Sequence, residues 1–434
     1  MPFCQQIGCS LLLFIMLSVS GGCGRDHQGK TSLVFSYGRL SEQHEEALTA
    51  LVAKFEEANP DFQVILHSLQ PSTDLQRHFY HRSFTARSRF IDVFEMDTIW
   101  TTELAAAGVL ASPPIALAQQ LKDFEAQTLA GASYGGELVA VPAFPAVSVL
   151  YYRSDILTKH GEKIPTNWQG LAAAAVKLGK AESMDGFVWQ GAAYEGLVCN
   201  FLEVYLAHGG TIQIAPQGVV LDEAMLAHSL EVMNNLITSG ASPASVATFH
   251  ELESRQRFLA GKAVFARDWD DLAGFVPESD VAGKVGIAQL PGTALHRGAP
   301  TLGGWHLAVN KYSQSQPGAW KLVEFLGSPE SQAFVAQRLG RLPSDLRVPL
   351  PVHQEVAGLT VVRESLAIAR PRPMSPYYHQ LSALLQAHVH DVLVGDATPE
   401  DAAAKLVEGA RQIDLPDTAG PEFPRSLLNP STLF

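Results

Sequence analysis

Residues 33–66, with the sequence LVFSYGRLSEQHEEALTALVAKFEEANPDFQVIL, decide the fold class. The apolar run at 33–35 predicts a buried strand. The apolar residues that recur at helical spacing after it are Leu48, Leu51, Val52 and Phe55. Asn59-Pro60 ends this helix, because proline cannot continue it, and 62–66 reads as a second strand. A strand, a helix and a strand in so short a span predict a βαβ unit and an α/β fold with parallel strands.

The alternation of strands and helices continues along the chain. A strand predicted at 93–96 leads directly to Asp97. Strands are also predicted at 139–141 and 149–152, on either side of a segment that contains proline. Ser328-Pro329 opens a helix that Gly340 closes, because serine caps and proline favours a first turn. The chain therefore reads as doubly wound α/β throughout.

Length and charge limit the possible classes of protein. The chain has 434 residues, which is too long for one compact core, so two lobes are expected. Apolar residues make up 47% and charged residues 17%, a globular composition. The net charge of −13 repels phosphate backbones, so nucleic acid is not expected as a partner.

Residues 1–23 have the pattern of a lipoprotein signal peptide. An apolar run, Leu11–Leu17, is too short to span a bilayer but fits the apolar part of a leader. Small residues precede Cys23, which resembles the cysteine of a bacterial lipobox and is the predicted lipidation site. The resemblance departs in Ser20, where a leucine is usual, and in the lack of Lys or Arg near the N-terminus. An ordinary signal peptide cut nearby is the alternative.

The segment after the leader, residues 24–31, is polar and rich in small residues and reads as a tether to the membrane. Cys4 and Cys9 would leave with the leader and Cys23 would carry lipid. Cys199 would then be alone in the mature chain, so no intrachain disulfide is expected.

Five segments, in this order, carry a resemblance to a known family. They are DVFEMD at 92–97 followed by Trp100, YGGEL at 134–138 running on to 141–142 and 150–153, GFVWQG at 186–191 with YEGL at 194–197, LGGW at 302–305, and RPRP at 370–373 with PYY at 376–378. Together they resemble extracellular sugar-binding proteins of ABC importers, over about 33–413. The trehalose/maltose-binding branch of that family is the most similar.

The resemblance implies the two-lobed fold of periplasmic binding proteins, with the ligand cleft between the lobes. One lobe is expected from residues 32–143 plus 300–345, and the other from 144–299 plus 346–414. Residues 415–434, which contain four prolines, are expected to form an irregular tail. Alternating strands and helices agree with such lobes, and clefts between lobes are favoured ligand sites.

The resemblance also implies a role. We expect a periplasmic or cell-surface protein, anchored by its lipid, that captures a carbohydrate and delivers it to the membrane subunits of an ABC importer. The expected ligand is a disaccharide such as trehalose or maltose, or a related glycoside. The protein is expected to act as a monomer and not as an enzyme, with no cofactor and no metal.

Two polar residues are predicted to bind the sugar, because ionised groups give the stronger hydrogen bonds to hydroxyls. Asp97 follows a strand, where α/β sheets present ligand groups. Its alternative role is to cap the helical segment that begins near Ile99. Arg372 lies between two prolines that fix its backbone. Its alternative role is an ion pair between the lobes.

Aromatic residues are predicted to cover the apolar C–H faces of the sugar. Trp305 follows Gly303 and Gly304, and glycine permits a close approach of the backbone. The resemblance places this indole against a sugar ring and places Trp269 at a second stacking position. Phe144 matches an aromatic residue beside the ligand. Trp305 could instead be a core residue.

Two acidic positions of the trehalose/maltose branch are not matched. An Asp usually follows two residues after the position of Phe144, and here Ala146 stands there. A Glu near the start of the first helix has no single counterpart, since Glu42, His44 and Glu45 all lie nearby. The resemblance therefore leaves the identity of the sugar open.

Three other functions compete with this prediction. Asp97 and Glu195 could form the acid and base of a glycosidase, but the sequence does not give their separation. His78 with His81, and His388 with His390, could bind metal, but no further ligand completes either pair. A binding-protein scaffold with a degenerate cleft is the third alternative, because of the unmatched acidic positions.

Overall fold

A computed structural model describes residues 29–39, 41–70, 72–215, 218–349, 356–357 and 359–413. The predicted leader with Cys23, most of the tether and the predicted tail lie outside these residues.

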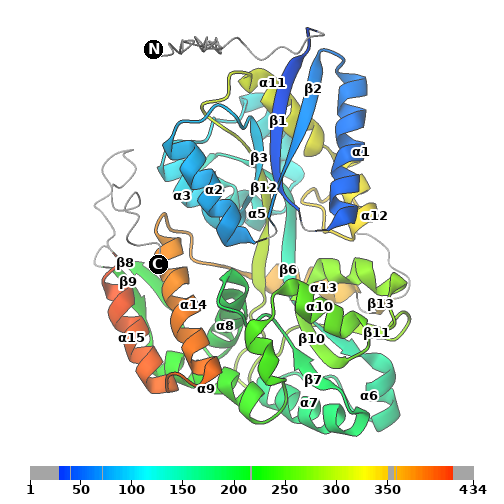
Figure 1. Cartoon of the computed structure of the whole chain (residues 1–434), viewed down its shortest axis with the longest axis vertical. Helices are drawn as coiled ribbons and strands as arrows, with labels where there is room; N and C mark the ends of the chain where they lie inside the picture. The colour runs from blue at the N-terminus through cyan, green and yellow to red at the C-terminus, as the bar shows by residue number, and fades with distance from the viewer. Residues whose placement is uncertain are drawn as a thin grey trace, which may run out of the picture.

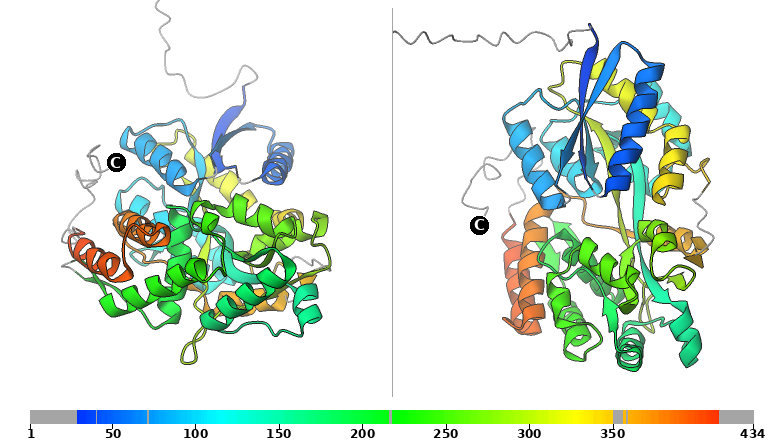
Figure 2. Two further views of the ribbon diagram at one scale, coloured as in Figure 1. Left: turned by 60° about the horizontal axis from the view of Figure 1, so that its bottom comes forward. Right: turned by 45° about the vertical axis from the view of Figure 1, so that its right-hand side comes forward.

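The chain forms two lobes stacked along the long axis of the molecule (Figure 1; Figure 2). The strands are β1 (Thr31–Gly38), β2 (Phe62–Leu69), β3 (Val93–Asp97), β4 (Ser133–Tyr134), β5 (Glu137–Leu138), β6 (Val141–Arg153), β7 (Asp185–Val188), β8 (Ile212–Ala215), β9 (Gly218–Leu221), β10 (Ala263–Trp269), β11 (Val285–Ala288), β12 (Thr301–Val309), β13 (Val356–Ala357) and β14 (Arg370–Pro371). Ten of the described strands form one sheet with the main order β13-β11-β6-β12-β3-β1-β2. In this sheet β10 pairs with β6 and β7, and β14 pairs with β12.

Helices cover both lobes (Figure 1). The α-helices are α1 (Glu42–Ala58), α2 (Thr73–Thr85), α3 (Thr101–Ala106), α4 (Ile115–Gln120), α5 (Ala126–Gly131), α6 (Ser154–His160), α7 (Trp168–Glu182), α8 (Glu195–Ala207), α9 (Glu223–Thr238), α10 (Glu251–Leu259), α11 (Gln316–Leu326), α12 (Pro329–Leu339), α13 (Leu359–Ile368), α14 (Tyr378–Val394) and α15 (Pro399–Arg411). Short 3₁₀ turns are η1 (Thr98–Trp100), η2 (Leu121–Asp123), η3 (Ala244–Thr248) and η4 (Asp270–Glu278). None of the helices among the described residues is long and apolar enough to span a bilayer.

The βαβ unit predicted at 33–66 is confirmed. Strands β1 and β2 pair in parallel, with Leu33 opposite Val64. The side chain of Ser41 accepts a hydrogen bond from the His44 amide at the start of α1, and Asn59 ends the helix. The four apolar residues predicted to form one face of α1 are all buried, namely Leu48, Leu51, Val52 and Phe55. The helix predicted between Ser328 and Gly340 is confirmed as α12, which ends at a left-handed glycine.

The two strands predicted at 139–141 and 149–152 are in fact one strand, β6, which runs from the upper lobe into the lower (Figure 1). The intervening prolines do not break it, because the ladder is already irregular where they lie. Pro145 is opposite Gly304, whose φ is +131°, and the register with β12 shifts between Trp305 and His306. A proline in a sheet is tolerated at such a bulge.

Three apolar clusters form the core. The largest belongs to the lower lobe and includes residues of β6, α7, α8 and α14. Two smaller clusters lie in the upper lobe, one with residues of α1 and α11, the other with residues of α2, β3 and η1. Tyr378, the first residue of α14, joins the latter cluster and so connects the two lobes. The exact lobe boundaries predicted from the sequence stay a prediction.

Candidate functional site

The predicted site residues meet where β3, β12 and β6 lie side by side at the junction of the lobes. Trp305 on β12 has Asp97 of β3 as its neighbour on one side and Phe144 of β6 on the other. Gly303 is opposite Ala146 of β6. The pairing register therefore gathers residues that are far apart in the sequence.

Asp97 is the last residue of β3 and is buried. Its Oδ1 accepts hydrogen bonds from the Ile99 amide, at 3.2 Å, and from the Thr98 hydroxyl, at 3.3 Å. The capping role considered for Asp97 is therefore present, as the N-cap of η1. These bonds use one carboxylate oxygen, which leaves Oδ2 for a ligand.

Arg372 connects the two lobes. It follows β14, which pairs with β12, and only 4% of its surface is exposed. Its Nη2 donates to Asp97 Oδ1 of the upper lobe, and its Nη1 donates to Glu195 Oε1 of the lower lobe, both at 2.8 Å. Burial opposes its charge, but Asp97 and Glu195 raise the pKa of the guanidinium well above its ordinary value. The ion pair between lobes is therefore present.

Glu195 is the lower-lobe end of this bridge. It is the first residue of α8, and its two oxygens also accept hydrogen bonds from the Tyr378 hydroxyl, at 2.7 Å, and the Ser382 hydroxyl, at 2.5 Å. Burial raises the pKa of Glu195, and Arg372 opposes that rise. Sequence reasoning did not assign Tyr378 or Ser382 to the site. Their spacing of four residues, which places them on the same face of a helix, is the only local signal that could have connected them.

This bridge does not suit glycoside hydrolysis. A glycosidase needs two carboxylates that face each other across the scissile bond. Here the guanidinium of Arg372 is bonded to both Asp97 and Glu195.

Trp305 and Trp269 lie near the junction where β3, β12 and β6 are side by side, which we call the seam. Trp305 is half-buried, and its ring meets Trp100 edge-on with 6.0 Å between centroids. The guanidinium of Arg267 lies 4.5 Å from the ring centroid of Trp269. A Cβ added to Gly303 would lie 3.0 Å from Cζ3 of Trp269, so the indole packs directly on this glycine. The sequence predicted that glycine here permits a close approach to the backbone, and the group that makes this approach is the indole of Trp269.

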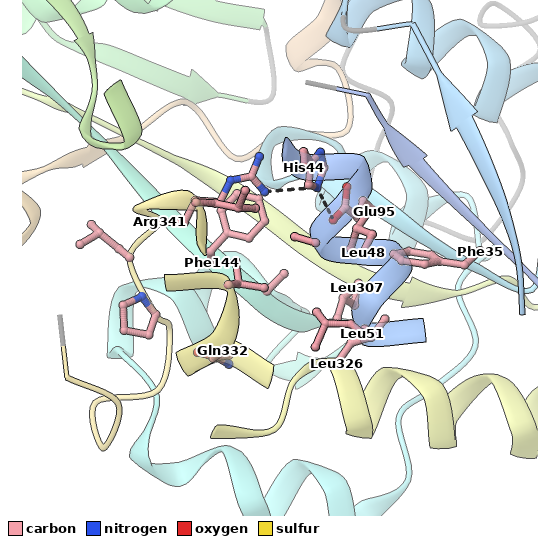
Figure 3. A pocket seen from close by; sticks show the side chains of 16 residues that line it. Phe35, His44, Leu48, Leu51, Glu95, Phe144, Leu307, Leu326, Gln332 and Arg341 are labelled. Carbon is pink, nitrogen blue, oxygen red and sulfur yellow. Dashed lines mark hydrogen bonds and ion pairs between the residues drawn. The ribbon is translucent and has the colours of Figure 1, made fainter. Parts of the chain in front are cut away.

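Phe144 borders a small buried pocket of the upper lobe (Figure 3). The guanidinium of Arg341 lies 4.0 Å from the centroid of the Phe144 ring. His44 lies next to Arg341. Its Nε2 is 3.5 Å from Arg341 Nη1 and 3.9 Å from Glu95 Oε1. Burial lowers the pKa of His44 well below its ordinary value and raises the pKa of Glu95 to about 7.

The three residues near the start of the first helix differ in where their side chains point. His44 is 2% exposed and faces inward (Figure 3), whereas Glu42 is exposed and Glu45 pairs with Arg39 near the surface. An imidazole therefore points inward from the start of α1.

A cavity of ≈ 170 Å³ lies beside the seam. Phe144, Gly303 and Arg372 line it, together with Thr98, Gln127 and His306. It contacts three of the six predicted ligand-binding residues and still holds open space. Sequence reasoning did not single out Gln127 or His306, because nothing in their local sequence shows that they face a cavity.

His388 and His390, one of the two pairs considered for metal binding, have other contacts. His388 Nδ1 lies 3.4 Å from Asp391 Oδ2, and His390 Nε2 lies 3.1 Å from the carbonyl oxygen of Ala247. Among the described residues, no group of three His, Cys, Asp or Glu side chains could hold a metal ion.

Comparison with known proteins agrees with this architecture. Residues 41–333 match the family described as bacterial extracellular solute-binding protein. A probable ABC transporter-binding protein of Deinococcus radiodurans is 32% identical over 362 residues, which cover 80% of this chain and 85% of that protein. The sn-glycerol-3-phosphate-binding periplasmic protein of Salmonella paratyphi A is 24% identical, covering 88% of this chain and 92% of that protein.

A solved structure, maltose-bound T. maritima MalE3, has 32% identity and a TM-score of 0.82. The match covers 88% of this chain and 99% of that one. The resemblance seen in the sequence and the predicted two-lobed fold are thereby confirmed, and the chain belongs to the family of bacterial extracellular solute-binding proteins.

Proposed function

We propose that this protein captures a neutral carbohydrate in the cleft between its lobes and delivers it to an ABC importer. The observation that carries the proposal is the convergence of Asp97, Trp305 and Arg372 at the junction of the lobes. A carboxylate, a half-buried indole and a guanidinium are the groups that hold sugar hydroxyls and cover sugar C–H faces. Phe144, Trp269 and Gly303 complete the proposed site.

The charges of the cleft favour a neutral ligand over a phosphate ester. Arg372 is already bonded to two carboxylates, Asp97 and Glu195. A phosphate there would bring a further negative charge beside Asp97, and like charges close to each other repel. Although one relative is a glycerol-phosphate-binding protein by name, we expect sugars without a phosphate to bind here. A disaccharide such as maltose or trehalose, or a related glycoside, is the proposed ligand.

Capture is proposed to work by closure of the lobes. A ligand that contacts both lobes favours the closed arrangement by its difference in affinity for the two states. The Arg372 bridge already joins β3 to α8, so the closed arrangement has one contact that does not depend on ligand. The importer would then recognise the closed protein.

We further propose that the mature protein is a monomer, outside the cytoplasm, tethered through lipid at Cys23. The apolar leader and Cys23 support the tether, and periplasmic relatives support the location. Cells that make wild type or Cys23→Ala should differ in incorporation of radiolabelled palmitate. Equal labelling of both forms would contradict lipidation at this residue.

The proposed ligand class can be tested with the purified chain from residue 24 onward. Isothermal titration with maltose, trehalose, maltotriose, a sugar alcohol and sn-glycerol 3-phosphate should show binding of at least one neutral carbohydrate. Solution scattering should then show a smaller radius of gyration at saturation. Leu295→Ala, whose side chain is 88% exposed, serves as a control that should bind as wild type does. Failure of every neutral carbohydrate to bind would remove the proposed function.

A further inference from the structure

The cavity beside the seam contains buried polar atoms that have no partner. Neither ring nitrogen of His306 makes a hydrogen bond of good geometry within the part of the chain that the structure describes, although the Gly131 backbone lies close to the ring. Arg372 Nε and Gln127 Oε1 have no hydrogen-bond partner there. His306 is 1% exposed and Arg372 is 4% exposed, and both line the cavity. Buried polar groups are nearly always paired, and an unpaired one costs free energy. Such a cluster indicates a site that a ligand completes.

Other polar side chains in the lining are already satisfied. The Thr98 hydroxyl donates to Asp97, and the Thr128 hydroxyl donates to the carbonyl oxygen of Glu125. The unpaired atoms also come from separate elements: His306 from β12, Gln127 from α5 and Arg372 from the end of β14. Three separate elements therefore bring unpaired groups to one cavity.

The chemistry of these atoms selects a class of ligand. Arg372 Nε can only donate, and Gln127 Oε1 can only accept. Burial lowers the pKa of His306 to about 4, against a smaller opposite effect of the Gly131 backbone, so the imidazole is neutral near pH 7 and offers one donor and one acceptor. A phosphate or carboxylate only accepts, and an ammonium only donates. A hydroxyl group does both, so a group with several hydroxyls matches this set.

Size and apolar lining point the same way. The cavity of ≈ 170 Å³ compares with an engineered cavity of about 150 Å³ that admits benzene. It therefore has space for about one six-membered ring. Its remaining walls are mainly apolar, and include Ile99, Leu302 and Met374. An apolar wall suits the C–H face of a sugar ring.

We propose that this cavity is a sugar subsite, in which His306 and Gln127 select one hydroxyl-bearing ring of the ligand. This inference rests on the proposed function, since the cavity shares Phe144, Gly303 and Arg372 with the proposed cleft. It adds that specificity for a neutral ring depends on two residues outside the six predicted ones. Ala146, at the unmatched acidic position, is then not the only determinant of which sugar binds.

The test uses substitutions that keep the size but remove the hydrogen bonds. His306→Leu and Gln127→Met should each weaken binding of the best carbohydrate of the panel by on the order of tenfold, measured by isothermal titration. The melting temperature without ligand should stay the same or rise, because unpaired buried polar atoms are removed. His306→Asn, which keeps a donor and an acceptor, should bind more tightly than His306→Leu. A purely structural histidine would give the opposite pattern of stability and no effect on affinity.

The outcomes separate this inference from the proposed function. If wild type binds a neutral carbohydrate and both His306→Leu and Gln127→Met keep its affinity, the subsite is wrong while the cleft stands. If wild type binds only sn-glycerol 3-phosphate, or nothing on the panel, both proposals are wrong. Gln127→Met lies on a different element from His306, so it decides the matter even if His306→Leu does not fold.

Discussion

The bridge through Arg372 allows a matched pair of substitutions to separate ligand binding from stability. Asp97→Asn and Glu195→Gln each replace a carboxylate by an amide of the same shape. Each carboxylate accepts one bond of 2.8 Å from the same guanidinium. Only Asp97 is proposed to bind the sugar, so we expect the two variants to fail in different ways.

Glu195→Gln should mainly affect stability. Its carboxylate is buried and accepts from three side chains, namely Arg372, Tyr378 and Ser382. Removing one charge of a buried ion pair typically costs 3–5 kcal/mol, and an amide keeps part of the bonding, so we expect a loss of about 3 kcal/mol. Asp97→Asn still leaves Arg372 paired with Glu195 and an amide oxygen for the cap of η1. Its loss of stability should be about 1–2 kcal/mol.

Asp97→Asn should instead have the larger effect on affinity. A sugar hydroxyl on Oδ2 would lose a charge-assisted bond worth about 1.5–3 kcal/mol, a tenfold to hundredfold increase in Kd. Glu195→Gln should raise Kd by a smaller factor, through the orientation of Arg372. Urea unfolding and isothermal titration on both variants measure the two quantities. The reasoning would be refuted if Asp97→Asn lost stability but kept the wild-type Kd, since Asp97 would then be only a cap and an ion-pair partner.

The sequence predicted the strand that delivers Asp97, because an apolar run and a following carboxylate are both local features. It also predicted that Trp305 and Arg372 share a site, although only through the family resemblance. It could not decide between a ligand role and an ion pair for Arg372. That choice depends on Glu195, which is 177 residues away and reaches Arg372 only through the packing of α8.

Burial explains what else the sequence could not show. His306 follows Trp305 directly, but its place beside a cavity depends on lining residues of η1, α5 and β6 that are far from it in the sequence. Glu42, His44 and Glu45 are neighbours in the sequence, and only the geometry of the first turn of α1 shows that the side chain of His44 faces inward. The sequence predicted two strands where β6 is one, because prolines are normally read as breaks. The irregular pairing that accommodates Pro142 and Pro145 is set by the register with β12, which is distant in the sequence.

Three further predictions follow from the same seam. Trp305→Ala should weaken sugar binding by about 2 kcal/mol or more in titration calorimetry, as for an aromatic anchor, and Trp305→Phe should weaken it less; unchanged Kd in both would exclude stacking on this ring. The pKa of Glu95 is about 7 in the folded chain against an ordinary 4.5, so the native state holds the extra proton between these values and stability falls as pH rises through them. Glu95→Gln should remove that fall, so its advantage over wild type in urea unfolding should grow by on the order of 3 kcal/mol from pH 4.5 to 8; a constant difference would contradict it. Ala146→Asp should restore the unmatched acceptor, because Ala146 is half-buried and opposite Gly303, where an added Cβ would lie 3.7 Å from that of Ala146 and 3.0 Å from the Trp269 ring. A carboxylate at 146 would therefore begin on the face of the sheet where Trp269 lies, and affinity for maltose or trehalose should rise by on the order of tenfold. If a folded Ala146→Asp protein binds neither sugar more tightly, the ligand does not reach this face of β6.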